Sequence, residues 1–167
     1  MRKNVFLLIC FTIFIYSCSN EKNEPIKNNY FNEPIIDWTL TKDNVKLKEQ
    51  RTLIADRSPD YYTITSIFES TGTGGLEYAG ENSKISSVQY FFFCNAGTLV
   101  QSEVIFVSNS TIATDLAEFA KKKYGDIYTE VANGNDLKLT WDKGNMLISY
   151  VKAGTNLYMM YRKNPLK

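Results

Sequence analysis

The stretch LKLTWDKGNMLISYVKAGTNLYMMYR, residues 137–162, contains three largely apolar runs separated by two short polar turns. In the first run apolar and polar residues alternate, with Leu137, Leu139 and Trp141 on one parity and Lys138, Thr140 and Asp142 on the other. This period of two is typical of a β-strand with one buried face and one face in water. Because short turns join antiparallel neighbours, the stretch predicts a three-stranded antiparallel meander.

Five stretches before this meander also carry strand patterns. They are residues 61–68, 76–79, 87–94, 99–107 and 127–131. The third of them, SVQYFFFC, is apolar on both parities, which predicts a central strand covered on both sides. The glycine-rich TGTGG, residues 71–75, is expected to be a hairpin loop, because it lacks the Gly-Lys-Ser or Gly-Lys-Thr of a phosphate-binding loop.

Residues 111–124 have the pattern of an amphipathic helix. Apolar residues recur at the i, i+4 and i+7 positions, namely Ile112, Leu116 and Phe119. Ser110 or Thr111 can cap the N-terminus of this helix, and Gly125 can end it. A shorter helix is expected at residues 42–50.

The order of these elements predicts the fold class. A helix and four strands are followed by a helix and four strands, all within one domain over residues 35–167. We therefore expect an α+β fold with a mainly antiparallel sheet of about eight strands and one or two packed helices. Each half of the domain has the same order of elements, which is compatible with two helix-plus-four-strand units. This layout resembles the tandem helix-plus-sheet build of secreted enzyme-inhibitor proteins and the small helix-and-sheet lipoproteins of outer-membrane assembly, although no functional residue carries over from either.

The N-terminus has the composition of a secretory signal peptide. Arg2 and Lys3 precede the apolar run VFLLICFTIFIY, residues 5–16. As a helix this run would be about 18 Å long, whereas the hydrocarbon core of a bilayer is about 30 Å thick. A basic start, a short apolar core and small or polar residues behind it predict a cleaved signal over residues 1–17.

The segment Ile15-Tyr16-Ser17-Cys18 resembles the lipobox of Gram-negative bacterial lipoproteins. The resemblance implies cleavage before Cys18, a diacylglycerol on its thiol and a further acyl chain on its amine, with palmitate as an expected lipid. Several acyl chains together anchor a protein stably. Ser19 in place of Asp resembles the sorting signal for the outer membrane, so the protein is expected in the cell envelope, facing the periplasm or the outside. Residues 18–34, polar and with two prolines, are expected to form a tether.

Composition excludes several kinds of chemistry. The chain contains no histidine, which removes Ser-His and Cys-His nucleophile systems, histidine general bases and histidine-containing zinc sites. Loss of residues 1–17 changes the formal net charge from +1 to −1, and a near-neutral domain has no electrostatic footprint for nucleic acid. Cys94 then remains as a free thiol among phenylalanines, which favours a core position. We expect no catalytic nucleophile, no metal and no cofactor.

Two functions from different classes fit the remaining residues. In the first, an envelope lipoprotein without enzymatic activity binds a protein or glycan through its sheet or loops. Its candidate surface residues are Tyr61, Tyr62, Tyr78 and Tyr158, because tyrosine rings on a sheet can stack on sugars or on partner side chains. In the alternative, the protein is a glycoside hydrolase, or a related enzyme acting on polysaccharide, that uses two carboxylates. The carboxylates considered for that role are Glu69, Glu77, Glu81 and Glu103.

Overall fold

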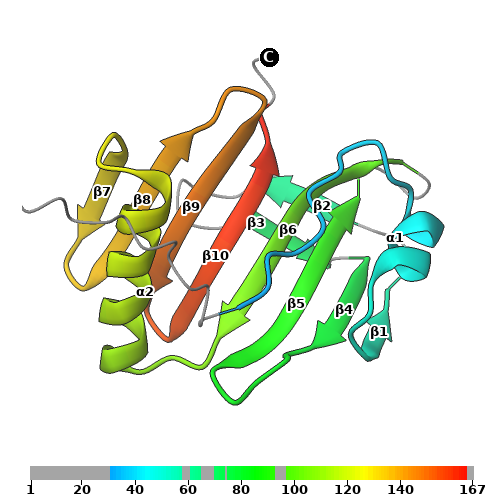
Figure 1. Cartoon of the computed structure of the whole chain (residues 1–167), viewed down its shortest axis with the longest axis horizontal. Coiled ribbons are helices and arrows are strands. Elements are labelled where there is room, and N and C mark those ends of the chain that lie inside the picture. Colours follow the sequence, from blue (N-terminus) through cyan, green and yellow to red (C-terminus); the bar gives the residue numbers. More distant parts are fainter. Residues whose placement is uncertain (1–30, 58–60, 65–69, 74, 93–96, 165–167) are drawn as a thin grey trace, which may run out of the picture.

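The structure is a computed structural model that describes residues 31–57, 61–64, 70–73, 75–92 and 97–164, with the backbone alone for 61–64 and 70–73. Its main element is a sheet of eight antiparallel strands. These strands are β1 (Leu53–Asp56), β4 (Leu76–Ala79), β5 (Ile85–Phe92), β6 (Leu99–Phe106), β7 (Thr129–Asn133), β8 (Asp136–Asp142), β9 (Met146–Ala153) and β10 (Asn156–Lys163). Across the sheet they lie in the order β1-β4-β5-β6-β10-β9-β8-β7 (Figure 1).

Two helices, an extended segment and a hairpin accompany this sheet. Helix α1 (Lys42–Lys48) lies at its β1 end, and helix α2 (Ser110–Tyr124) lies over the half formed by β7 to β10 (Figure 1). Residues 31–40, which we call the strap, cross the same side of the sheet between the two helices. The hairpin of β2 (Tyr61–Ile64) and β3 (Ser70–Thr73) is drawn behind the sheet, on the side away from α2. The molecule therefore has a sheet-dominated α+β fold with two helices among the described residues.

Helix α2 is the longer helix that the sequence predicts, but its N-terminal cap differs. The side chain of Asn109, rather than that of Ser110 or Thr111, accepts a hydrogen bond from the backbone N–H of Ile112 at 2.8 Å. The backbone of Asn109 is extended, so its carboxamide can fold back over the first turn. Gly125 ends the helix with a φ of 94°, a conformation that favours glycine.

The apolar side of α2 packs on the sheet as its spacing predicts. Leu116 is fully buried, Phe119 is 8% exposed, and Ile112 packs against the core while partly exposed. Ala113 is also buried, and its carbonyl accepts a hydrogen bond from the hydroxyl of Tyr150 on β9 at 3.2 Å. The helix is thus held by both apolar burial and a polar contact to the strand beneath it.

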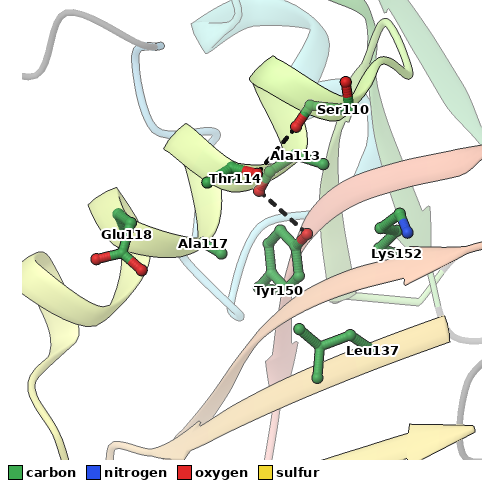
Figure 2. A pocket seen from close by; sticks show the side chains of 8 residues that line it. All are labelled: Ser110, Ala113, Thr114, Ala117, Glu118, Leu137, Tyr150 and Lys152. Atoms are coloured by element: carbon green, nitrogen blue, oxygen red, sulfur yellow. Dashed lines mark hydrogen bonds between the residues drawn. The ribbon is translucent and has the colours of Figure 1, made fainter. Parts of the chain in front are cut away.

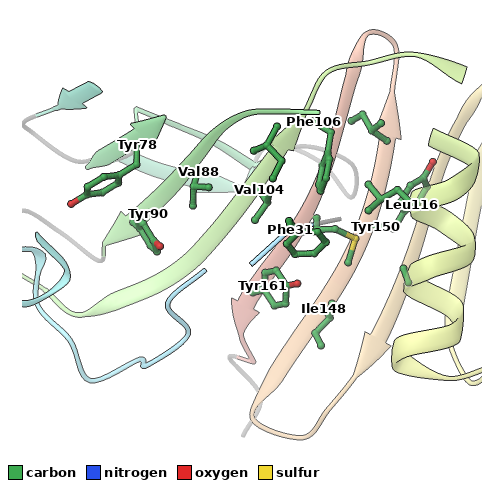
Figure 3. Packing of buried hydrophobic residues seen from close by; sticks show 14 of the residues in the cluster. Phe31, Tyr78, Val88, Tyr90, Val104, Phe106, Leu116, Ile148, Tyr150 and Tyr161 are labelled. Atoms are coloured by element: carbon green, nitrogen blue, oxygen red, sulfur yellow. The ribbon is translucent and has the colours of Figure 1, made fainter. Parts of the chain in front are cut away.

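A single core lies between the sheet and the elements that cover it. Figure 3 shows part of this core, including Phe31, Tyr78, Val88, Tyr90, Val104, Phe106, Leu116, Ile148, Tyr150 and Tyr161. The alternation predicted for the first meander strand is confirmed, because Leu139 and Trp141 are fully buried and Thr140 is not. The indole N–H of Trp141 donates to the carbonyl of Gly125 at 2.7 Å, which ties β8 to the end of α2.

The strap contributes to this core although it forms neither helix nor strand. Phe31 is 2% exposed, and its ring meets those of Phe106 and Phe119 edge-on with centroids 5.4 and 5.7 Å apart. The carbonyl of Ile35 accepts a hydrogen bond from the hydroxyl of Ser102 at 2.6 Å. The packed part of the chain therefore includes Phe31, which precedes the expected domain start at residue 35.

Some expectations about strands are corrected by the structure. β1 has no counterpart among the expected strands, and β2, which begins the expected strand 61–68, lies in the separate hairpin. Residues 70–73 form strand β3, whereas the glycine-rich stretch was expected to be a loop from residue 71. β1 carries mostly exposed side chains, so it has no alternating apolar pattern that could reveal it. β5 is central as expected, with Phe91 and Phe92 buried, while Cys94 lies outside the described residues.

Candidate functional site on the polar face of the sheet

The register of the sheet places a row of mostly polar side chains on the face away from α2. Each residue is the direct cross-strand partner of the next, and across β4, β5, β6, β10, β9 and β8 the row is Glu77, Gln89, Glu103, Met160, Ser149 and Thr140. Residues of the opposite parity, such as Tyr90, Val104 and Tyr150, belong to the core. We call this side the polar face; it also carries Gln101, Lys138, Tyr158 and Arg162.

Hydrogen bonds join the polar side chains of this face in pairs. The pairs are Gln89 with Glu77 at 3.1 Å, Gln101 with Glu103 at 2.6 Å and Thr140 with Ser149 at 3.0 Å. Gln101, Glu103 and Ser149 are buried, so these bonds satisfy groups that would otherwise be costly to remove from water. Apolar side chains would cover a sheet at less cost, so packing alone does not explain this row.

The part of the polar face on β8, β9 and β10 is the more accessible part and carries positive charge. Lys138, Thr140, Tyr158 and Arg162 are half-buried there, whereas Glu103 on β6 is 7% exposed. Burial lowers the pKa of Lys138, and the positive charge of Arg162 lowers it further. In the register, Lys138 lies in a row with Val151 and Tyr158, whereas Arg162 lies in a row with Leu147 and Gln101. This half of the face can offer a ligand both hydrogen bonds and positive charge.

The structure separates the four tyrosines that the sequence grouped as a candidate surface. Tyr158 is half-buried on the polar face. Tyr78 is 2% exposed, and its ring packs edge-on against Tyr90 in the core, so it contributes to no surface. Tyr61 and Tyr62 lie in β2, where side chains are outside the described part of the chain. Of the four, Tyr158 is the residue that the described part of the structure places on the polar face.

A hollow of about 300 Å³ lies on the opposite face, between α2 and the strands β8 and β9. Figure 2 shows its lining, which is Ser110, Ala113, Thr114, Ala117, Glu118, Leu137, Tyr150 and Lys152. Small side chains on α2 leave this space beside the ring of Tyr150, whose hydroxyl is engaged by the carbonyl of Ala113. Lys152 donates to the carbonyl of Asn135 at 2.9 Å. The hollow can accept a small apolar group, but the hydroxyl of Tyr150 and the amine of Lys152 are used in hydrogen bonds to the backbone that stabilise the fold.

An ionic cluster fastens the strap to the sheet. Arg51 lies 3.0 Å from a carboxylate oxygen of Glu49 and 3.0 Å from one of Glu81, and it donates to the carbonyl of Asn32 at 2.9 Å. The hydroxyl of Tyr90 donates to Glu49. Burial alone would raise the pKa of Glu49, but the hydrogen bond from Tyr90 and the N–H and charge of Arg51 outweigh it and hold the pKa below its ordinary value. We call Glu49, Arg51, Glu81 and Tyr90 the strap clasp.

The carboxylates named as hydrolase candidates are placed in separate contacts. Glu77 pairs with Arg57, Glu81 belongs to the strap clasp, and Glu103 accepts from Gln101. Glu69 lies outside the described residues. The clasp does line a pocket of about 280 Å³, but a glycosidase needs a carboxyl group whose pKa is raised, and that of Glu49 is lowered. In the part of the chain that the structure describes, no three acidic or cysteine side chains are grouped to hold a metal ion.

Sequence reasoning missed two structural features: the shared face of Lys138 and Arg162, and the strap clasp. The alternation over residues 137–141 predicts that Lys138 shares a face with Thr140, but only the register across β8, β9 and β10 shows that Arg162 lies on the same face, in the row of Asp142 and Leu147. Glu49 and Arg51 follow a short helix and belong to no periodic pattern, so nothing in the sequence marks them.

Comparisons with protein-family models, with curated proteins and with solved structures give no match for this chain. Within the described ranges, no helix is both long enough and apolar enough to cross a membrane. Cys18 and the expected signal peptide precede the first described residue.

Proposed function

We propose that this protein is an envelope lipoprotein, anchored by lipid at Cys18 and without enzymatic activity, that binds a protein or glycan partner through its polar face. The observation that carries the proposal is the row of polar side chains across six neighbouring strands. Paired side chains keep their positions, and the half-buried hydroxyl of Thr140 can exchange a hydrogen bond with a ligand. Binding sites for polar ligands are built in this way from a few fixed hydrogen-bonding groups.

We propose further that the molecule consists of two helix-plus-four-strand units. The strand orders β1-β4-β5-β6 and β7-β8-β9-β10 mirror each other about the β6–β10 pair, and each set of four follows one helix in the sequence. Joined in this way, the units present one continuous polar face with a buried acidic part on β6 and an accessible basic part on β8 to β10.

The anchor is tested by replacing Cys18 with Ser, which removes the thiol that would carry the diacylglycerol. We expect the Cys18→Ser protein to leave the membrane fraction or to keep its signal peptide, as judged by fractionation and intact mass. The wild-type protein is the control. A Cys18→Ser protein of mature length that fractionates with the outer membrane would refute the anchor.

The binding function is tested with the lipidated protein in detergent. Crosslinking and pull-down from native envelopes, together with a glycan array, supply the ligand, and its affinity is then measured for two matched variants. Thr140→Gln lengthens a half-buried side chain in the middle of the accessible part of the polar face, and we expect about tenfold weaker binding, or about 1.4 kcal/mol. Thr114→Gln on the exposed side of α2 should leave affinity unchanged. Full affinity in Thr140→Gln would argue against the polar face.

The hydrolase alternative is supported by one observation, the pocket of about 280 Å³ beside Glu49 and Glu81. It is less favoured because Arg51 contacts both carboxylates, and because the pKa of Glu49 is lowered, whereas a general acid needs a raised pKa. Incubation with envelope polysaccharides tests it directly. Turnover that is abolished by Glu49→Gln or Glu81→Gln, with the fold intact, would establish the enzyme and displace the binding function.

A further inference from the structure

Residues 31–36, the first part of the strap (Figure 1), are held on the sheet by side chains rather than by strand pairing. The backbone N–H of Asn32 donates to a carboxylate oxygen of Glu81. The backbone N–H of Ile35 donates to the hydroxyl of Tyr90 at 3.2 Å. Since these bonds are not part of the strand ladder, residues 31–36 can separate from the sheet without breaking the pairing of any strand.

Only part of this segment is buried. Phe31 and Pro34 are buried, whereas Asn32, Glu33 and Ile36 are exposed. Segments with few buried apolar contacts open at a smaller free-energy cost than the strands of a core. The polar contacts of the segment therefore contribute much of what holds it in place.

The strap clasp provides these contacts on one side. Glu81 accepts two hydrogen bonds from Asn32 and lies 3.0 Å from Arg51. Glu49 also lies 3.0 Å from Arg51, and it accepts a hydrogen bond from the hydroxyl of Tyr90. The pocket of about 280 Å³ borders both carboxylates, so protons from the solvent can reach them.

Glu33 provides the contacts on the other side, toward α2. Its carboxylate lies 2.8 Å from the amine of Lys123 and accepts a hydrogen bond from the hydroxyl of Tyr124 at 2.8 Å. The hydroxyl of Tyr161 on β10 donates to the same carboxylate oxygen at 3.5 Å. Residues 31–36 thus lie between two sets of contacts, each of which depends on ionised glutamate.

Acid removes the charge of these glutamates while their positive partners keep theirs. Burial would raise the pKa of Glu33 and of Glu49, but hydrogen bonds and a positive charge at each carboxylate lower both pKa values below 4.5. A carboxylate with a lowered pKa stabilises the structure above its ordinary pKa and begins to lose that contribution as pH falls below it. Arg51 and Lys123 remain charged in acid, so each is then left without its ionised partner.

Residues 37–40, the second part of the strap, are attached differently. The carbonyl of Leu40 accepts a hydrogen bond from the backbone N–H of Leu99 at the start of β6, at 2.8 Å. The backbone N–H of Leu40 donates to the carbonyl of Asp37 at 3.1 Å, which makes a turn directly after residue 36. The carboxylate of Asp37 lies 3.7 Å from the amine of Lys48, and both side chains are exposed, so this ion pair contributes little. The turn is therefore the hinge at which residues 31–36 can separate from the part that stays.

We propose that residues 31–36 are an acid-released latch: protonation of Glu33, Glu49 and Glu81 frees this segment from the sheet while the eight strands stay paired. Release uncovers the aromatic core side chains that Phe31 contacts in the closed state. It also lengthens the chain between the proposed anchor and the fold, which would extend the reach of a lipid-anchored domain. Only that last consequence depends on the proposed function.

The test is hydrogen–deuterium exchange of the lipidated protein in detergent, followed by mass spectrometry from neutral pH to about pH 3. Each rate is divided by that of an unprotected peptide at the same pH, which removes the intrinsic effect of acid on exchange. We expect the protection of residues 31–36 to fall at least about tenfold below pH 4.5, whereas the protection of β9 and β10 stays unchanged.

Variants test the role of the carboxylates at neutral pH. Glu49→Gln should lower the protection of residues 31–36 about tenfold, because a hydrogen bond to a charged group is lost. Glu33→Gln should have the same effect from the α2 side. Its side chain is 36% exposed, so this variant gives a readout if Glu49→Gln fails to fold. Glu130→Gln, exposed on β7, is the matched control and should keep the wild-type protection.

Three results would overturn the inference. Loss of protection at the same pH in residues 31–36 and in β9 would mean that acid unfolds the molecule as a whole. Protection of residues 31–36 that persists to about pH 3 would mean that the glutamates do not control the segment. An equal loss of protection in Glu130→Gln would show that Glu33 and Glu49 have no special role. The proposed binding function is unaffected by these outcomes, because the test contains no ligand.

Discussion

Arg51 joins three parts of the molecule that are distant in sequence. Its guanidinium contacts Glu49, which follows α1 in the sequence, and Glu81, which follows β4. It also contacts the carbonyl of Asn32 in the strap. The side chains of Arg51 and Glu49 are only 12% and 4% exposed. Removing one member of such a pair leaves the other charge buried without compensation, which costs more than the intact pair contributes.

We therefore expect Arg51→Met to lower the free energy of unfolding by about 3–5 kcal/mol. The measurement is equilibrium unfolding in urea at neutral pH. Lys121→Met on α2 is the matched control, because the Lys121–Glu118 pair is long, at 3.9 Å, and its glutamate is 72% exposed. That change should cost about 0–1 kcal/mol. A similar small loss for Arg51→Met would mean that the strap clasp is not a stabilising feature.

The strap clasp also makes stability depend on pH. The pKa of Glu49 is lowered from 4.5, as described above; burial would likewise raise that of Glu33, but hydrogen bonds from Lys123 and Tyr124 lower it below 4.5. A group whose pKa is lower in the folded state stabilises the fold above its unfolded value and loses that contribution as pH falls. The free energy of unfolding should thus stay constant from neutral pH down to the pH range in which an unfolded glutamate titrates, near its ordinary pKa of 4.5, and should decline below it.

This decline is measurable by urea unfolding over a series of acidic buffers. Glu49→Gln should start from a lower stability at neutral pH and fall less on acidification than the wild type does, because its amide does not titrate. Glu130→Gln on the exposed edge strand β7 is the control and should follow the wild-type curve. Parallel curves for Glu49→Gln and wild type would show that Glu49 contributes nothing to the acid sensitivity.

Among the elements, α2 is the one whose packing against the sheet the sequence predicts most directly. Its apolar spacing points Leu116 and Phe119 into the core, and both are buried there. Leu116→Asp should abolish stable folding at room temperature or lower the melting temperature by many degrees, because it buries an unpaired charge and removes a core side chain. Thr114→Asp, on the exposed side of the same helix, should change stability by no more than about 1 kcal/mol. Thermal unfolding followed by circular dichroism distinguishes these outcomes, and an unchanged melting temperature for Leu116→Asp would show that another face of α2 contacts the sheet.

Strands could be predicted where their two faces have different environments. The strand over residues 137–141 alternates because one side meets the core and the other does not, and the structure confirms it. β1 is an exposed edge strand, and its residues LIAD therefore carry no such contrast. The cap of α2 was missed for a different reason: Asn109, Ser110 and Thr111 are all good cap residues, and backbone conformation selects among them.

At the scale of the whole molecule, the sequence predicts the helix–strand order but not which strands meet. The β6–β10 pair, which joins the halves and completes the polar row, connects residues more than fifty positions apart. No local pattern encodes such a pairing. The sequence therefore predicted only parts of the candidate site, namely Tyr158 and the polar side of the strand over residues 137–141. Tyr78 shows the opposite failure, because a strand tyrosine can equally face the core.

The central claim is that the polar face, and not the helix-covered face, contacts the ligand. It is tested most directly by site-specific photo-crosslinking in intact envelopes, with a photoreactive residue in place of Tyr158 on the polar face or of Thr114 on α2. We predict a discrete adduct from position 158 that an excess of the ligand identified by pull-down or glycan array competes away, and no such adduct from position 114. Adducts from position 114 alone, or equal labelling from both positions, would contradict the claim.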